Sequence, residues 1–169
     1  MRLTDRTDYA FRVLMYLAVN GGRLATVGGI AARYGTSHSH LTRVVWTLGR
    51  AGFVETVRGK GGGLRLARPA DAIAVGAVAR VMENGVPLAE CFPGGAGGCR
   101  IEPCCALKGI LSEAEAAFFA VLDRYTVEDL VRGNPELRAF VLAGPTGGAS
   151  SVVRSEGRST DRRRKARPG

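Results

Sequence analysis

The spacing of apolar residues in the first third of the chain predicts three short helices. Apolar positions recur at i, i+3, i+4 and i+7 in three successive segments, which is the spacing of one helix face. The sets are Ala10, Val13, Leu14 and Leu17; Val27, Ile30, Ala31 and Tyr34; and Leu41, Val44, Val45 and Leu48. Gly35-Thr36-Ser37 joins the second and third segments, with Gly35 suited to a positive φ and Ser37 suited to capping the next helix. This arrangement predicts a helix-turn-helix.

The pattern becomes strand-like after residue 52. Residues 53–57 (FVETV) and 64–66 (LRL) read as two strands, separated by a glycine-rich tip from Arg58 to Gly63. Three helices and a basic hairpin predict a winged helix over residues 1–70. Arg58 and Lys60 at the tip suit a minor groove or phosphates, because the glycines allow close approach. A nucleotide-binding loop does not fit, since the Walker spacing and a following helix are absent.

The third helix carries a polar face that favours DNA recognition. The positions outside its apolar stripe hold hydrogen-bond donors of the kind that read base edges or hold phosphates. His38 and His40 are either solvated residues or DNA contacts, and we expect at least one to contact DNA because this end of a recognition helix enters the major groove. The predicted contacts of this segment are Ser37, His38, Ser39, His40, Thr42 and Arg43.

A second region, residues 71–143, is predicted to contain a short helix over Val75–Met82 and a long amphipathic helix beginning at Pro103. The long helix has two apolar faces. They hold Leu107, Leu111, Ala114, Phe118, Val121 and Tyr125 on one side, and Ile110, Ala117 and Leu122 on the other. One face can cover the winged helix, and the other suits a second copy of the chain. We therefore expect a homodimer, the alternative being a buried helix in a monomer.

Composition limits the class of protein. A chain of 169 residues with 46% hydrophobic content suits one compact domain, or a small domain with an oligomerisation arm. A net charge of +9 favours a polyanionic partner such as double-stranded DNA. Residues 144–169 are predicted to form a disordered basic tail, either simply solvated or adding non-specific DNA affinity. The sequence contains no evident Ser/His/Asp set and no paired acid and base in a shared motif, so nothing in it indicates an enzyme.

The chain shows no signal peptide and no stretch of transmembrane length. We therefore expect a cytoplasmic protein, without a membrane partner, in which thiols stay reduced. In that setting closely spaced cysteines favour metal ligation or redox chemistry over structural disulfides, which remain the weaker alternative.

All four cysteines fall in one Gly/Pro-rich stretch, at Cys91, Cys99, Cys104 and Cys105. Cysteines used for packing would be scattered through apolar positions. Zinc sites commonly use C-x₂₋₄-C pairs, a spacing met here only between Cys99 and Cys104. The wider gaps favour an iron-sulfur cluster. With Pro103 at the first position of the long helix, Cys104 and Cys105 would lie in its first turn, where the helix dipole favours thiolates.

About residues 1–143 resemble the bacterial winged-helix transcriptional regulators that carry iron-sulfur clusters, the IscR and NsrR types. The likeness lies in four segments and is greatest to the nitric-oxide-sensing NsrR repressors. The segments are LTDRTDYAFRVLMYLA, TSHSHLTRVVWTLGRAGFVETVRGKGGGLRLARP, CRIEPCCALKGIL with the cysteine loop before it, and LDRYTVEDLV. The resemblance implies a homodimeric repressor that binds a palindromic operator and releases it when nitric oxide destroys a 4Fe-4S cluster.

The resemblance also implies the cluster ligands: Cys91, Cys99, Cys105 and, from the other subunit, Asp8. Cys104 departs from the family pattern and is either a spare thiol or an alternative ligand. Without the resemblance, Asp8 reads equally well as an acidic residue in the first turn of a helix. Asp8 lies one helical turn from Arg12, so a bond at Asp8 would also fix the helix that presents Arg12 to DNA.

Two other functions remain open from the sequence. One is an IscR-like regulator of iron-sulfur assembly or iron supply with a 2Fe-2S cluster. The other is an electron-transfer or interaction module, against which the donor-rich helix face and basic hairpin argue.

Overall fold

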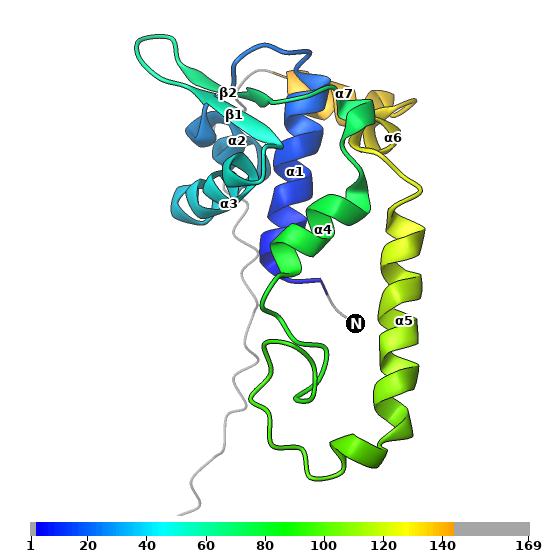
Figure 1. Ribbon diagram of the computed structural model, residues 1–169. Coiled ribbons are helices and arrows are strands. Elements are labelled where there is room, and N and C mark those ends of the chain that lie inside the picture. Colours follow the sequence, from blue (N-terminus) through cyan, green and yellow to red (C-terminus); the bar gives the residue numbers. More distant parts are fainter. Residues whose placement is uncertain (1–2, 144–169) are drawn as a thin grey trace, which may run out of the picture.

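The computed structural model describes residues 3–143 and is mainly helical, with one antiparallel hairpin (Figure 1). The elements, in chain order, are helices α1 (Asp5–Val19), α2 (Val27–Tyr34) and α3 (His38–Arg50), strands β1 (Val54–Val57) and β2 (Gly63–Leu66), the 3-10 turn η1 (Ala70–Ala72), helix α4 (Val75–Glu83), the 3-10 turn η2 (Glu102–Cys104), and helices α5 (Ala106–Leu122), α6 (Val127–Val131) and α7 (Pro135–Leu142). The predicted fold class, a winged helix followed by a long helix, is confirmed.

The core forms around α1, and the apolar stripes predicted for α1 and α3 are confirmed. The side chains of both stripes are at most 7% exposed. In α2, Ile30 and Ala31 are buried, whereas Val27 and Tyr34 are only partly buried against the core. The same cluster continues past residue 70 through Ile73, Val78 and Val127, so α4 and α6 extend the core of the winged helix.

The turn between α2 and α3 confirms one prediction made from the sequence and contradicts another. Gly35 has the predicted left-handed conformation, with φ of 62°. Ser37 occupies the N-cap position of α3, but its side chain makes no capping hydrogen bond. The prediction of a Ser37 cap was therefore wrong, because its hydroxyl instead shares a hydrogen bond of 2.9 Å with the Ser39 hydroxyl.

The wing has the predicted antiparallel pairing, with Val54 opposite Leu66 and Val57 opposite Gly63. Phe53 is buried just before β1. The base of the wing joins the domain through a bridge between Ala25 and Leu64. At Gly63 a Cβ atom would lie 2.7 Å from the Ala25 carbonyl oxygen, so only glycine allows this close approach.

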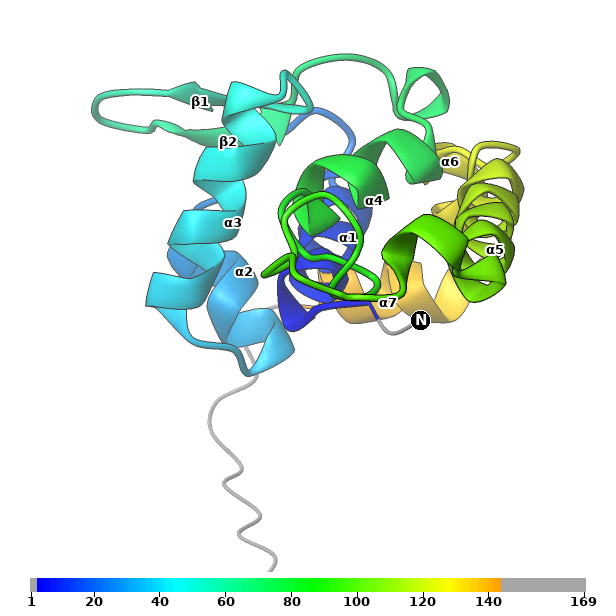
Figure 2. The same cartoon turned by 60° about the horizontal axis from the view of Figure 1, so that its bottom comes forward.

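Helix α4 lies across α1, and α5 packs on α4 (Figure 2). The predicted helix over Val75–Met82 is confirmed, with one residue added at its end. Helix α5 begins later than predicted: Pro103 lies in η2, and Cys105 is the N-cap of α5. The placement of Cys104 and Cys105 in the first turn of the long helix was therefore wrong, because a separate 3-10 turn precedes that helix.

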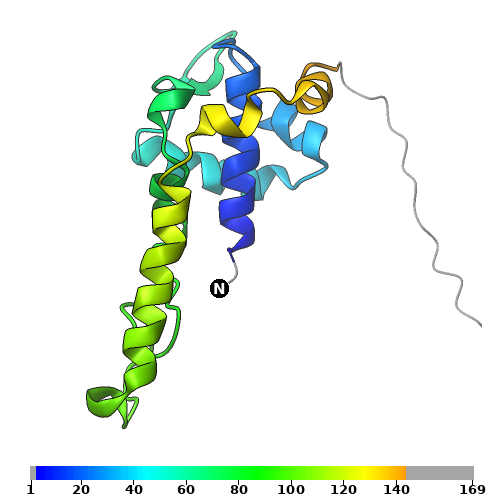
Figure 3. The same ribbon diagram turned by 90° about the vertical axis from the view of Figure 1, so that its right-hand side faces the viewer.

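Helix α5 buries none of its residues within the chain. Figure 3 shows it extending well past the start of α1. Its principal helix contact is α4, so the expected contact with the winged helix is made largely through α4. The predicted basic tail, residues 144–169, lies outside the described residues. Among the helices of residues 3–143, none combines the length and apolar character that crossing a bilayer requires.

Candidate nucleic-acid interface and cysteine loop

The outward face of α3 is exposed and rich in hydrogen-bond donors. Because Leu41, Val44, Val45 and Leu48 turn inward, Ser39 and Arg43 lie on the opposite side of the helix. The predicted contact residues of this segment, Ser37, His38, Ser39, His40, Thr42 and Arg43, are all exposed. The Thr42 hydroxyl donates to the His38 carbonyl oxygen over 2.9 Å, which fixes the orientation of its side chain.

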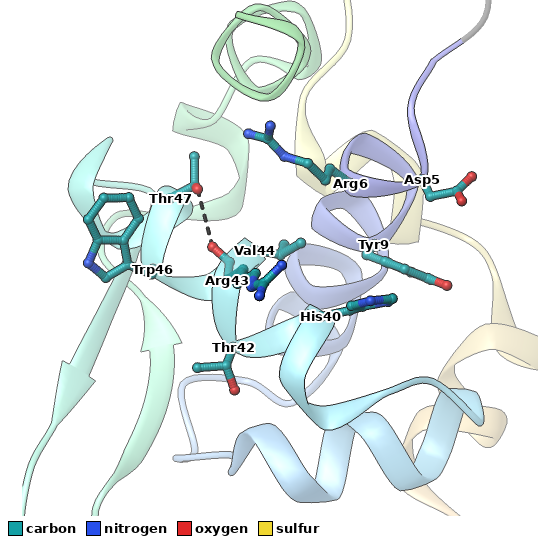
Figure 4. Close-up of a pocket in the computed structure, with 9 residues that line it drawn as sticks. All are labelled: Asp5, Arg6, Tyr9, His40, Thr42, Arg43, Val44, Trp46 and Thr47. Carbon is teal, nitrogen blue, oxygen red and sulfur yellow. Dashed lines mark hydrogen bonds between the residues drawn. The ribbon is translucent and has the colours of Figure 1, made fainter.

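The two histidines lie on opposite flanks of α3. His40 faces α1 across an open surface cavity of about 750 Å³. Figure 4 shows this cavity, which is also lined by Arg6 and Tyr9 of α1 and by Arg43 and Trp46 of α3. His38 faces α2, since a Cβ at Gly28 would lie 3.9 Å from His38 Cδ2.

Trp46 and Arg50 extend the exposed face beyond the predicted contact set. Trp46 is 62% exposed, and the Arg50 guanidinium lies 4.9 Å from the centroid of its ring. Both residues follow Ser39 and Arg43 at helical spacing, a signal available from the sequence. Arg6 was also missed, and nothing in the sequence indicates that it shares a cavity with α3.

The wing tip presents Arg58 and Lys60 as predicted. Both side chains are exposed, and neither has an ion-pair partner within residues 3–143. The tip bends through Gly59 and Gly61, whose φ angles are 98° and 80°. Helix α3 and the wing thus offer two separate cationic surfaces that a polyanion can contact.

Arg12 is held in one position by its neighbours. Its guanidinium lies 2.7 Å from the Asp8 carboxylate and 5.6 and 5.9 Å from the ring centroids of Tyr9 and Tyr34. Burial raises the pKa of Tyr34 to about 12, although the Arg12 charge acts in the opposite direction. Tyr34 also packs against Phe140 of α7, with ring centroids 5.4 Å apart. Arg12 therefore connects α1 with α2 and, through Tyr34, with α7.

The cysteine loop, defined here as residues 84–105, carries four free thiols. Cys91, Cys99 and Cys105 are half-buried, whereas Cys104 is exposed. The Cys104 thiol donates to the Ile101 carbonyl oxygen over 3.4 Å, and its greater exposure distinguishes it from the other three thiols.

Cys91 and Cys105 share a cationic neighbour. Lys108, in the first turn of α5, donates to Glu102 over 2.6 Å. This hydrogen bond is the main reason why the pKa of Lys108 is raised, and the negative charges of Glu102, Cys91 and Cys105 add to it. Two of the predicted ligands thus lie near one ammonium group.

Residues 3–143 of a single chain contain no cluster of three or more His, Cys, Asp or Glu side chains placed to hold a metal ion. The structure therefore does not bring Cys91, Cys99 and Cys105 together, and Asp8 lies on α1, outside the loop. The donor chemistry nevertheless fits an iron-sulfur cluster, because free thiols are its usual ligands. The loop also contains left-handed glycines at Gly85, Gly94, Gly97 and Gly98, which suit a backbone that wraps around a ligand.

Residues 3–133 match the Rrf2 family, described as an iron-dependent transcriptional regulator. The chain is 41% identical over 146 residues to the HTH-type transcriptional regulator NsrR of Halalkalibacterium halodurans, covering 86% of this chain and all of the relative. It is 44% identical over 138 residues to NsrR of Bacillus subtilis, covering 81% of this chain and 94% of the relative.

Solved structures of regulators share the fold. CymR of B. subtilis, titled the global cysteine regulator, superposes with a TM-score of 0.62 at 28% identity, over 78% of this chain and 96% of that chain. IscR of T. potens gives a TM-score of 0.62 at 25% identity, over 80% of this chain and 90% of that chain. With regulators rather than enzymes as its relatives, and with a family match over most of its length, this chain belongs to the Rrf2 family of transcriptional regulators.

Proposed function

We propose that this chain is an NsrR-type repressor that binds a palindromic operator as a homodimer and senses nitric oxide through a 4Fe-4S cluster. The proposed ligands are Cys91, Cys99 and Cys105, completed by Asp8 of the partner subunit. The observation that carries the proposal is the set of three half-buried free thiols on one glycine-rich loop, in a chain with NsrR relatives that match more than four fifths of its length.

The ligands differ in the strength with which they hold iron. A cluster held by these residues would supply irons with which nitric oxide can react. A carboxylate oxygen is a harder donor than a thiolate and binds iron less firmly, so Asp8 would be the ligand most easily lost. The exposure of Cys104 and its hydrogen bond to Ile101 support its assignment as a spare thiol.

Two residues of α1 connect the proposed ligand position at Asp8 with the helix-turn-helix. The Asp8 carboxylate is paired with Arg12 at 2.7 Å, and Arg12 is packed against Tyr34 at the end of α2, immediately before the turn into α3. A change in the bonding of Asp8 therefore alters what holds Arg12. Because Arg12 contacts the base of the helix-turn-helix, this change reaches the element that we propose reads the operator.

The apolar surface of α5 supports the homodimer. Leu107, Ile110 and Val121 of α5 are 45–62% exposed, although the helical spacing assigns them to its apolar faces. An exposed apolar surface of this extent usually marks a contact with another protein. A second copy of α5 would bury it and place two recognition helices on the half-sites of a palindrome.

The proposal is tested by titrating anaerobically isolated protein with nitric oxide while its operator binding is followed by gel shift. We expect a visible absorbance with about four irons and four sulfides per chain, and loss of operator binding as the absorbance reacts. Undiminished binding after complete reaction would refute the switch. Cys99→Ala should lack the absorbance and Cys104→Ala should retain it, and the reverse result would overturn the ligand assignment.

An IscR-like regulator with a 2Fe-2S cluster is the second candidate, favoured by the structural similarity to IscR of T. potens. The iron and sulfide counts decide between the two, since a 2Fe-2S cluster would give about two of each per chain. We propose a cytoplasmic location under either function, because both clusters depend on reduced thiols.

A further inference from the structure

Glu83, the last residue of α4, accepts three hydrogen bonds from the start of α1. The backbone nitrogen of Thr4 donates to Glu83 Oε1 over 2.8 Å, and the Thr4 hydroxyl donates over 2.9 Å. The hydroxyl of Thr7, a fully buried residue, donates to the same oxygen. Thr4 is the N-cap of α1, yet its side chain makes no capping bond within its own helix. Glu83 thus anchors the start of α1 through Thr4 and Thr7.

This contact joins two segments that are central to the proposed function. The cysteine loop begins at Asn84, the residue after Glu83, while Thr7 directly precedes Asp8 on α1. Figures 1 and 2 show the end of α4, the origin of the loop and the start of α1 on the same side of the molecule. Within one protomer, the carboxylate of Glu83 therefore links the base of its own cysteine loop to the helix that carries Asp8 and Arg12.

Helix α4 is also held at the contact with α5. Arg80 makes two hydrogen bonds with Asp123, of 2.6 and 2.5 Å, and its guanidinium lies 4.8 Å from the ring centroid of Phe119. Val78, Ala79 and Met82 of α4 are fully buried. With α4 fixed on α5 and in the core, Glu83 is the residue of α4 that joins the base of the loop to the start of α1.

We propose that Glu83 is a positioning residue that couples the state of the cysteine loop to the position of α1 in the same subunit. The proposal rests on the proposed function, since it assumes that the loop changes state when it gains or loses its cluster. It adds a second connection to α1: Asp8 would bond the cluster of the partner subunit, whereas Glu83 would report the loop of its own subunit.

The test compares Glu83→Ala, Glu83→Gln and Thr7→Val in the full-length dimer. In Glu83→Ala we expect unchanged cluster absorbance and iron content, with a Kd for the operator raised about tenfold in the cluster-loaded protein. Glu83→Gln keeps an acceptor oxygen and should recover most of this loss. Thr7→Val, which removes one donor at nearly constant volume, should fall between them. Glu136→Gln is the matched control, because Glu136 is exposed and without a hydrogen-bond partner in the described part of the chain.

A second measurement separates positioning from simple stabilisation. Hydrogen exchange of the amides of residues 4–8 should be faster in Glu83→Ala than in wild type, and in wild type it should become faster when the cluster is removed. If Glu83→Ala lowers only the melting temperature, and leaves operator affinity and exchange over residues 4–8 unchanged, the residue is merely structural and the proposal is overturned.

The failure of the proposed function gives a different result. If the proposed function is wrong, the wild-type protein itself would bind the operator with equal affinity with and without the cluster. In that case the coupling between loop and operator binding is also refuted, while exchange over residues 4–8 in Glu83→Ala still reports whether Glu83 fixes α1.

Discussion

Replacing Gly76 by alanine tests how closely α4 must approach the end of α5. A Cβ atom at Gly76 would lie 2.0 Å from Asp123 Oδ1, 2.8 Å from Asp123 Cγ and 3.0 Å from the Asp123 backbone nitrogen. The carboxylate can turn away only by breaking its hydrogen bonds with Arg80. The backbone nitrogen can move only if the C-terminal end of α5 shifts. Gly76→Ala should therefore strain the junction between the two helices.

Two opposing effects determine the free energy of unfolding of this variant. Alanine in a helix is favoured over glycine by about 0.8–1 kcal/mol. Overpacking a close contact costs about 1–3 kcal/mol. Gly28→Ala is a matched control, because Gly28 is likewise the second residue of its helix and a Cβ there meets only His38 Cδ2 at 3.9 Å. We expect Gly76→Ala to be less stable than Gly28→Ala by about 1–3 kcal/mol.

Thermal unfolding measures this difference directly. For a domain of this size the expected gap in melting temperature between the two variants is about 2–12 °C. Both variants must be compared at one protein concentration, because the proposed dimerisation would add to apparent stability. Equal melting temperatures would show that α5 shifts without cost, and would refute the reasoning that Gly76 is required for close packing.

Four further predictions concern α5, α6 and the wing. Ile110→Glu places a charge on the exposed apolar face of α5 and should give monomers in sedimentation velocity; a dimer of wild-type strength would contradict the proposed interface. Thr126→Ala removes the capping box of α6 and should lower the free energy of unfolding in urea by about 1 kcal/mol. The hydrogen bonds from Thr126 hold the pKa of Asp129 below its ordinary value, so its contribution to stability is present at neutral pH and is lost as the pH falls below the unfolded-state pKa and through the lower folded-state pKa. Asp129→Asn should lack this acid-dependent loss. Arg58→Ala and Lys60→Ala should each reduce the slope of log K against log salt for operator binding by about 0.9 if each side chain contacts one phosphate.

The winged helix could be predicted from the sequence because the helical spacing of apolar residues coincides with the faces that are buried in the fold. The stripes of α1 and α3 are the buried faces, and Gly35 has the conformation that its turn requires. The errors occur where several local solutions compete. The Ser37 hydroxyl has Ser39 as an alternative partner, and Pro103 suits the start of a 3-10 turn as well as that of an α-helix. Composition alone does not separate these alternatives.

The candidate site was predictable where it depends on helical spacing, and was missed where it depends on contacts between distant residues. The exposed face of α3 follows from its buried stripe, and Trp46 and Arg50 continue it. Glu83, by contrast, meets Thr4 across 79 positions of sequence. A glutamate at the end of a short helix gives no signal of such a partner. Only the packing of α4 across α1 brings the two residues together.

On the two proposals made above, helix α1 has two attachments that belong to different subunits. Its first turn is bonded to Glu83 of its own chain, and Asp8 would be a ligand in the loop of the partner. Each α1 would then respond to both loops of the dimer. It follows that reaction of a single cluster would loosen one attachment of each of the two α1 helices, and both half-sites would weaken together.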